Sequence, residues 1–252
     1  MDRRHLLTAL GGLALCPICT VTARSAEGAK WSFAEGPIGP SKWGELDPAY
    51  KACSIGTQQS PINIASPIKA QLPPLKIDWG KTTNTIANTG QTIQVNIGEG
   101  STLTLGKDSY KLLQFHFHRP SEHRIDGKSF PMEAHFVHAT PSGSLAVIGV
   151  MMTEGKSNAV FKSLIATMPA KQGPAVKADP AINPLGLLPS NRTYYRYHGS
   201  LTTPPCSETV EWIVLTDPVQ VAATDIAGFA KLYAMNGRPL QPLNRRMLLR
   251  LE

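Results

Sequence analysis

The sequence lacks the features that identify repeat proteins and nucleic-acid-binding proteins. Its 252 residues contain no internal repeat, no low-complexity tract and no block of like charges, and the positive residues are scattered along the chain. No nucleic-acid-binding motif is present either. With 42% hydrophobic residues, the chain is long enough to form one well-filled domain or at most two small ones. We therefore expect a globular protein that does not bind nucleic acid.

An apolar run long enough to cross a membrane is also missing. The short apolar stretch at residues 6–15 follows a pair of arginines and precedes small residues up to Ala26, which is the layout of a cleavable export signal over residues 1–26. The mature domain, residues 27–252, would then be periplasmic or secreted. Cleavage removes three positive residues and one negative residue, so the formal net charge falls from +7 to about +5.

Cysteine is scarce, with four in the whole chain, and Cys16 and Cys19 lie in the segment to be removed. Only Cys53 and Cys206 are left. In an exported protein an even pair predicts one disulfide. It would close a loop of about 150 residues and contribute about 4–5 kcal/mol in the chain-entropy model.

Glycine and proline, in contrast, are plentiful, with 21 of each, which favours a loop-rich β protein. Periodicity predicts strands at 92–97, 102–105, 111–118, 133–138, 145–152 and within 194–215. The run at 145–152 is apolar throughout, as in a central strand buried on both faces. Two helices are expected, one at 158–168 and one that Thr224 caps and that extends to Tyr233.

Histidines gather between residues 114 and 138. His116 and His118 are two apart on a predicted strand, so both project to the same face. His135 lies on the strand predicted to return beside it. If it lies opposite the first pair, three imidazoles converge, and three neutral nitrogens with one open position are what a catalytic zinc needs.

Two neighbours favour a metal site over an ordinary buried strand of alternating aromatic and histidine residues. Gln114 lies two before His116, and Glu133 lies two before His135. Each could accept the remaining ring N–H of a ligand, as groups behind zinc ligands commonly do. A rival interpretation is a cupin, a jelly roll with iron or manganese, in which the spacing from His116 to Glu122 would make Glu122 a ligand.

Six motifs help to decide between the zinc site and the metal site of a cupin. They are Gln-Ser-Pro-Ile-Asn-Ile (59–64), Gln-Phe-His-Phe-His (114–118), Ser-Glu-His (121–123), Glu-x-His-x-Val-His (133–138), Ser-Leu-Thr-Thr-Pro-Pro (200–205) and Arg-Pro-x-Gln-Pro (238–242). In this order and spacing the chain resembles the α-class carbonic anhydrases of the bacterial, exported type. The resemblance covers nearly the whole chain after the signal. The cupin interpretation leaves His135 and the threonine-rich segment unexplained.

The resemblance implies a mainly β, α+β single domain with short surface helices on one large, twisted, mostly antiparallel sheet of about ten strands. It implies a zinc lyase that reversibly hydrates carbon dioxide to bicarbonate and a proton through zinc-bound hydroxide. Zinc would be held by His116, His118 and His135, with Gln114 and Glu133 behind them. The protein would be a monomer or homodimer without a membrane span, and Cys53 and Cys206 match the disulfide of bacterial members.

By the same resemblance, Thr202 accepts the proton of the hydroxide and donates to Glu122, which makes Glu122 an orienting acceptor and not a ligand. The expected substrate-binding residues are Val137, Val147, Leu201, Val210, Trp212 and Thr203. His123 and His138 match buried, hydrogen-bonded histidines without a role at the metal. A non-catalytic binding module, which some relatives became by losing a zinc ligand, stays the alternative.

Two departures from the family pattern affect the expected turnover number. Phe33 stands where a tyrosine hydroxyl usually joins the water network, and Gln91 stands where fast members carry a proton-relaying histidine. Neither change touches the expected metal ligands. They affect the expected turnover number and leave the expected reaction unchanged.

Overall fold

The computed structural model describes residues 29–80 and 82–252. The predicted export signal at residues 1–26 lies outside the described residues. Within the described ranges, no helix combines the length and the apolar character needed to cross a membrane.

Strands are the main regular structure of the described chain. They are β1 (Asn63–Ile64), β2 (Ile68–Ala70), β3 (Lys76–Trp79), β4 (Thr85–Asn88), β5 (Ile93–Asn96), β6 (Ser101–Leu105), β7 (Asp108–His118), β8 (Arg124–Ile125), β9 (Met132–Ala139), β10 (Leu145–Glu154), β11 (Val176–Lys177), β12 (Tyr194–Gly199), β13 (Val210–Leu215), β14 (Val219–Val221) and β15 (Leu249–Leu251). β1 pairs with β8, and the other described strands form one 13-stranded sheet.

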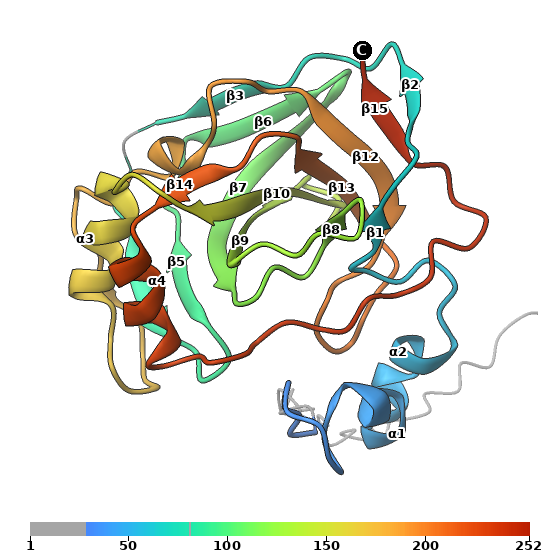
Figure 1. Cartoon of the computed structure of the whole chain (residues 1–252), viewed down its shortest axis with the longest axis horizontal. Helices are drawn as coiled ribbons and strands as arrows, with labels where there is room; N and C mark the ends of the chain where they lie inside the picture. The colour runs from blue at the N-terminus through green and yellow to red at the C-terminus, as the bar shows by residue number, and fades with distance from the viewer. Residues whose placement is uncertain (1–28, 81) are drawn as a thin grey trace, which may run out of the picture.

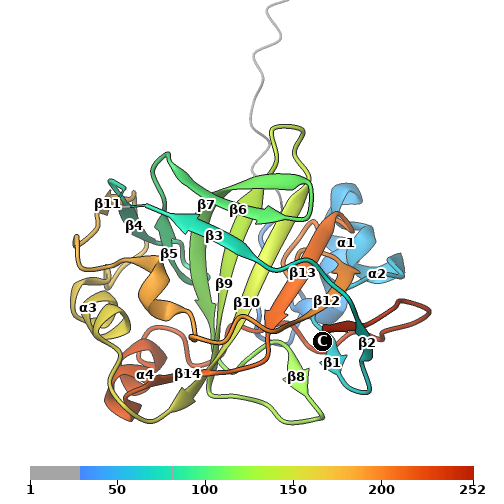
Figure 2. The same ribbon diagram turned by 90° about the horizontal axis from the view of Figure 1, so that it is seen from above.

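The main path of this sheet runs β11-β4-β5-β7-β9-β10-β13-β12-β15-β2, and Figure 2 shows most of these strands side by side. Most neighbours are antiparallel, but β10 pairs with β13 in parallel, as does β15 with β2. The predicted mainly β domain on one large, mostly antiparallel sheet is confirmed, and the jelly roll of a cupin is not formed. β10 lies between β9 and β13 and is buried from residue 146 to 152, as its apolar run predicts.

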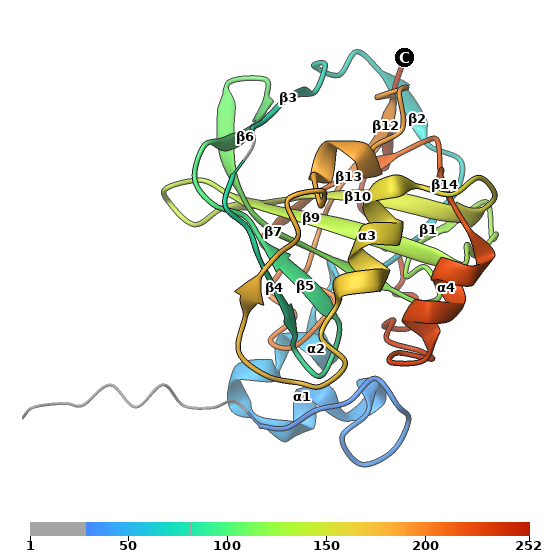
Figure 3. The ribbon, with the colours of Figure 1, turned by 90° about the vertical axis from the view of Figure 1, so that its left-hand side faces the viewer.

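The helical segments are short and lie around the sheet. They are η1 (Pro40–Lys42), α1 (Trp43–Leu46), η2 (Pro48–Tyr50), α2 (Ala52–Ile55), α3 (Ala159–Thr167), η3 (Pro184–Leu187) and α4 (Ala223–Ala230). α1 and α2 lie together beyond one end of the sheet, whereas α3 and α4 pack side by side at its flank (Figures 1 and 3).

The two predicted helices form, but one cap differs. Asn158 caps α3 by accepting from the backbone N–H groups of the first turn, in agreement with a start at that residue. The prediction that Thr224 caps α4 is wrong, because the backbone leaves its extended conformation at Ala222 and places Thr224 inside the helix. Asp225 in the first turn offers a favourable charge to the helix dipole instead. The helix ends before Tyr233.

The sheet separates two apolar cores. Neighbouring residues of a strand point to opposite faces, so Trp212 and Ile213 of β13 enter different cores, as do Val147 and Ile148 of β10. The larger core includes Trp79, Phe115, Phe117, Phe136, Phe161 and Phe229. The smaller core includes Ile62, Ile64, Val147, Tyr197, Val210 and Trp212.

A β-bulge divides β7. The pairing of β7 with β9 shifts by one residue between Leu112 and Gln114. Before the shift, Tyr110 and Leu112 enter the larger core, and after it Phe115 and Phe117 do. An extra residue of this kind reverses the alternation of the strand. Gln114 and the even-numbered residues that follow it therefore face the side of the sheet that carries the smaller core.

The predicted disulfide between Cys53 and Cys206 is present. It joins α2 to the loop that follows β12, across 153 residues of sequence. Cys206 is fully buried against Phe33 and Trp43. The bridge thus anchors the N-terminal segment to the loop that also carries Thr202.

We expect reduction of this disulfide to lower the melting temperature by roughly 10 °C, because the long loop makes the entropic contribution large. The measurement is thermal unfolding of the mature protein with and without reductant. The double variant Cys53→Ala/Cys206→Ala is the control, and it should melt like the reduced wild type whether or not reductant is added. An unchanged melting temperature on complete reduction would contradict the expectation.

Candidate metal centre

Three histidines meet on the side of the sheet that carries the smaller core. His116 and His118 lie on β7 after the bulge, and His135 lies directly opposite His116 on β9. One ring nitrogen from each of the three lies within 4.8 Å of the others. The alternate residues Phe115 and Phe136 stack on the opposite face, with ring centroids 5.4 Å apart. The strand pattern thus brings the three predicted ligands together.

Two polar side chains hold two of these imidazoles by their other nitrogen. Gln114 Oε1 lies 2.8 Å from Nδ1 of His116, and Glu133 Oε1 lies 2.8 Å from Nε2 of His135. An acceptor at one nitrogen places the ring proton there and leaves the other nitrogen free as a ligand. The predicted spacing of two residues therefore gives the predicted contacts.

The partner of the third imidazole has no signal in the sequence. Nδ1 of His118 lies 2.8 Å from the backbone carbonyl oxygen of Asn236, which is 118 residues away along the chain. Since any residue can offer a carbonyl, only the tertiary structure identifies this acceptor. Nε2 of His118 is buried without a hydrogen-bond partner among the described residues. A buried ring nitrogen without a hydrogen-bond partner is free to act as a metal ligand.

Burial keeps these imidazoles neutral. It lowers the pKa of His118 to about 4 and holds the pKa values of His116 and His135 below their usual range. Glu133 is also buried, which opposes its ionisation, but the adjoining His123 and His135 hold the pKa of its carboxyl well below the usual range. The site therefore presents three neutral nitrogens and one buried negative charge, a donor set that suits a divalent cation such as zinc.

Glu133 also binds His123. Its Oε1 lies 2.7 Å from Nδ1 of His123, whose Nε2 lies 2.6 Å from the hydroxyl of Tyr197. Both nitrogens of His123 are thus occupied, although His123, Glu133 and His135 lie close enough to form a second metal-ligand group. His138 is buried on the opposite face of the sheet, where it packs against Trp79 and its Nδ1 lies 3.2 Å from the carbonyl of Ala146. Both positions agree with the structural roles expected for these histidines.

Glu122 and Thr202 lie next to the histidines, and both are buried. Glu122 Oε2 lies 3.8 Å from Nδ1 of His135, while Oε1 accepts the backbone N–H of Arg238 at 2.7 Å. Burial raises the pKa of Glu122 to about 7, against the lowering effect of its neighbours, the Thr202 hydroxyl among them. Oε2 itself makes no hydrogen bond within the described residues, so it remains available as an acceptor.

An apolar wall stands beside the histidines. The five predicted wall residues all belong to the smaller core or pack against it: Val137, Val147, Leu201, Val210 and Trp212. The ring of Trp212 lies 4.9 Å from that of His135, centroid to centroid. Thr203, the other predicted substrate contact, follows Thr202 in the same loop and is half-buried.

Comparison with known proteins agrees with this geometry. The sequence profile of the eukaryotic-type carbonic anhydrases matches residues 38–251. The chain belongs to the α-class carbonic anhydrase family. A carbonic anhydrase from Pectobacterium carotovorum is 42% identical over 90% of this chain and 93% of its own length. The predicted enzyme class is therefore confirmed.

Solved structures of carbonic anhydrases give the same result. The α-carbonic anhydrase of Thermovibrio ammonificans, in complex with the inhibitor sulfanilamide, is 43% identical, with a TM-score of 0.85 over 88% of this chain and 99% of its own. A hyperthermostable carbonic anhydrase from a hydrothermal vent chimney is 44% identical, also with a TM-score of 0.85, over 88% of this chain and 100% of its own.

The two departures from the carbonic anhydrase pattern lie near the histidines. Phe33 is buried, and its ring centroid lies 6.2 Å from that of His118, so a ring without a hydroxyl occupies this place. Gln91 is half-buried, and its Nε2 donates to the carbonyl of Trp31 at 3.3 Å. The backbone carbonyl of Gln91 accepts from Asn236, the residue whose own carbonyl contacts His118.

Proposed function

We propose that this carbonic anhydrase converts carbon dioxide and water to bicarbonate and a proton, reversibly, with a zinc ion held by His116, His118 and His135. The observation that carries the proposal is the convergence of three imidazole nitrogens within 4.8 Å, each ring having its other nitrogen hydrogen-bonded. We propose Gln114 and Glu133 as the side chains that orient His116 and His135 toward the metal.

Zinc bound there would lower the pKa of a coordinated water so that a nucleophile is available near neutral pH, an effect for which carbonic anhydrase is the standard example. The carboxylate of Glu133 is hydrogen-bonded to His135 and would make that imidazole a better electron-pair donor to the ion. Because all three rings are neutral, they would hold a zinc ion without adding a charge that stabilises the coordinated water against deprotonation.

Thr202 and Glu122 orient the nucleophile in this proposal. Glu122 offers a buried oxygen without a hydrogen-bond partner, to which the hydroxyl of Thr202 can donate. A hydroxyl that donates to a carboxylate has only its lone pairs left, so Thr202 would accept a hydrogen bond from the nucleophile and orient the lone pair of the nucleophile toward the substrate. The backbone N–H of Thr202 meets the developing negative oxygen of bicarbonate.

Carbon dioxide is small and apolar, so its binding place needs a dry wall more than hydrogen-bond donors. We propose the wall of Val137, Val147, Leu201, Val210 and Trp212 for this role, with Thr203 beside it. The five wall residues lie in or against the smaller core, and the ring of Trp212 contacts that of His135. A wall built into the core of the protein is rigid, and it keeps the substrate against the nucleophile.

We also propose that the chain is exported to the periplasm or secreted, as a monomer or homodimer that carries the disulfide. Carbon dioxide and bicarbonate would be its substrates at this site.

The test combines metal analysis with a hydration assay on the purified mature protein. We expect about one zinc per chain, rapid hydration of carbon dioxide, and inhibition by a sulfonamide such as the sulfanilamide bound in the Thermovibrio structure. A fully occupied site holding iron or manganese, with no hydration, would overturn the proposal. A zinc-loaded protein without hydration would favour a binding module.

The residue at position 91 should limit the turnover number. Each cycle must release a proton from the cleft, and the amide of Gln91 has no pKa near 7 with which to accept and release it. We expect Gln91→His to raise kcat about tenfold at low buffer concentration and to leave kcat/KM unchanged, because substrate attack involves the same metal and wall. Stopped-flow hydration at several buffer concentrations measures both constants.

Gln91→Asn is the matched control, since it keeps an amide at this position and should change neither constant. The wild-type kcat should itself rise with buffer concentration. A high wild-type kcat that does not depend on buffer would show that another group already carries the proton.

A further inference from the structure

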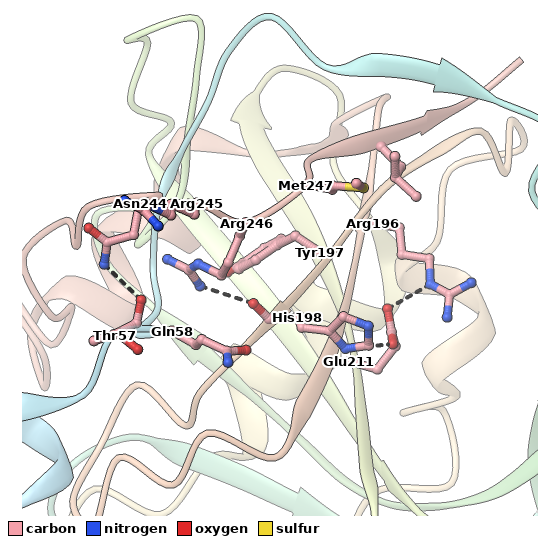
Figure 4. Close-up of a pocket in the computed structure, with 11 residues that line it drawn as sticks. Thr57, Gln58, Arg196, Tyr197, His198, Glu211, Asn244, Arg245, Arg246 and Met247 are labelled. Atoms are coloured by element: carbon pink, nitrogen blue, oxygen red, sulfur yellow. Dashed lines mark hydrogen bonds and ion pairs between the residues drawn. The ribbon is translucent and has the colours of Figure 1, made fainter.

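A cavity of about 870 Å³ opens where the pairing between β12 and β15 ends (Figure 4). β13 pairs with β12 along its whole length, but β15 pairs only with Tyr195 and Arg196. The chain that precedes β15 turns away from the rest of β12 and leaves a hollow. Its volume lies within the usual range of ligand sites, about 300–1,000 Å³.

This cavity is separate from the metal centre. Glu211 lies between Val210 and Trp212 on β13, and both neighbours point into the smaller core beside the histidines. Because strand residues alternate, Glu211 points to the opposite face of the sheet. Arg196 and His198 of β12 contact Glu211 there and line the cavity with it.

Positive charge dominates the lining. Three arginines, Arg196, Arg245 and Arg246, line the cavity together with one carboxylate, that of Glu211. Glu211 is already engaged, because Oε1 accepts from Nε of Arg196 at 2.7 Å and Oε2 lies 3.1 Å from Nδ1 of His198. Within residues 29–80 and 82–252, no carboxylate forms an ion pair with Arg245 or Arg246. The cavity therefore carries a net positive charge.

The contacts of Arg246 hold its charge in place without neutralising it. Its guanidinium donates to backbone carbonyls, among them those of His198 at 3.0 Å and Gln59 at 2.8 Å, and it lies over the ring of Tyr197. All of these are neutral groups. Glu208 acts on Arg246 from outside the lining, but its Oε1 is taken by N–H donors such as the backbone of Gln58.

The remaining wall is apolar and open. Met247 is 72% exposed, which is unusual for a large apolar side chain, and Leu249 lies beside it in the lining. Arg245 of the same lining is exposed. Arginines next to apolar side chains complement a molecule with an anionic end and an apolar body.

We propose that this cavity binds a small organic anion, whose carboxylate or phosphate head is attracted by the arginines of the lining and whose apolar body lies on Met247 and Leu249. The forked guanidinium matches the oxygens of either head group. The cavity shares no lining residue with the three histidines, so the ligand would bind at a place distinct from the metal.

Calorimetric titration of the zinc-loaded enzyme tests the proposal. Excess sulfonamide is present throughout, so that the anion cannot bind at the metal. The probes are hexanoate and hexyl phosphate, with hexan-1-ol as the neutral counterpart of equal length. We expect saturable binding of at least one anion with a dissociation constant below about 1 mM and no binding of the alcohol. The tighter anion identifies the preferred head group.

Two exposed positions make the test specific. Arg245→Gln removes one charge of the lining and should weaken binding roughly tenfold, and Met247→Glu should abolish it by placing a negative charge on the apolar wall. Lys107→Gln makes the same charge change in an exposed turn elsewhere and should have no effect. The proposal is wrong if neither anion binds, if hexan-1-ol binds equally well, or if the two cavity variants bind like wild type.

Discussion

The variant His116→Ala should lose its zinc and with it almost all hydration activity. Two of the three imidazoles would remain, but the variant lacks the ring that lies opposite His135 and is held by Gln114. Groups that only orient a zinc ligand are typically worth about 10–100-fold in metal affinity, so removal of a ligand itself should cost more than about 100-fold. Zinc content after dialysis and the initial hydration rate measure the two losses.

Two further substitutions show whether the effect belongs to the metal. Gln114→Ala should weaken zinc binding by a smaller factor, because the ligand stays and only its orienting acceptor is lost. His198→Ala removes an exposed imidazole far from the centre and should leave zinc and activity unchanged. Full zinc occupancy in His116→Ala would mean that the ligand set has been assigned wrongly.

The variant Thr202→Ala should keep its zinc and lose roughly two orders of magnitude in kcat/KM, because the attacking lone pair is no longer oriented. The three histidines and their hydrogen-bond partners do not involve Thr202, so the metal should stay bound. Parallel measurements of zinc content and hydration rate separate the two effects.

Thr202→Ser is the matched control, since it keeps the hydroxyl and should retain most of the activity. The pair can also be tested as a unit. If Thr202 acts through Glu122, then Glu122→Gln should lower kcat/KM far less in the Thr202→Ala variant than it does in the wild type. Simple additivity, or full activity in Thr202→Ala, would contradict the proposed roles.

Much of the fold could be predicted because the strands are long and regular. The apolar run at 145–152 is buried on both sides, as a strand between two neighbours must be, and the Asn158 cap lies where the α3 pattern begins. The Thr224 cap was wrong because a helix start depends on where the preceding strand ends, and side-chain preference alone does not determine that. Local pattern therefore predicted which elements form better than where they begin.

At the candidate site, too, contacts within one strand could be predicted, whereas contacts from distant segments could not. Gln114 and Glu133 contact their histidines across a spacing of two residues, which a single strand fixes. The carbonyl of Asn236 and the backbone N–H of Arg238 reach the site from a distant segment. Main-chain groups are the same in every residue, so no sequence pattern can indicate them in advance.

The bulge in β7 determines how the strand tolerates mutation. Before Leu113, the even-numbered positions of β7 enter the larger core, and a polar residue at one of them should destabilise the fold most. After Leu113, the odd-numbered positions are the sensitive ones. Leu113 itself is 39% exposed and opposes no residue of β9, so it should accept most side chains. Deletion of Leu113 should nevertheless be harmful. Without this extra residue, either Leu112 would leave the larger core or the histidines would turn to the opposite face of the sheet.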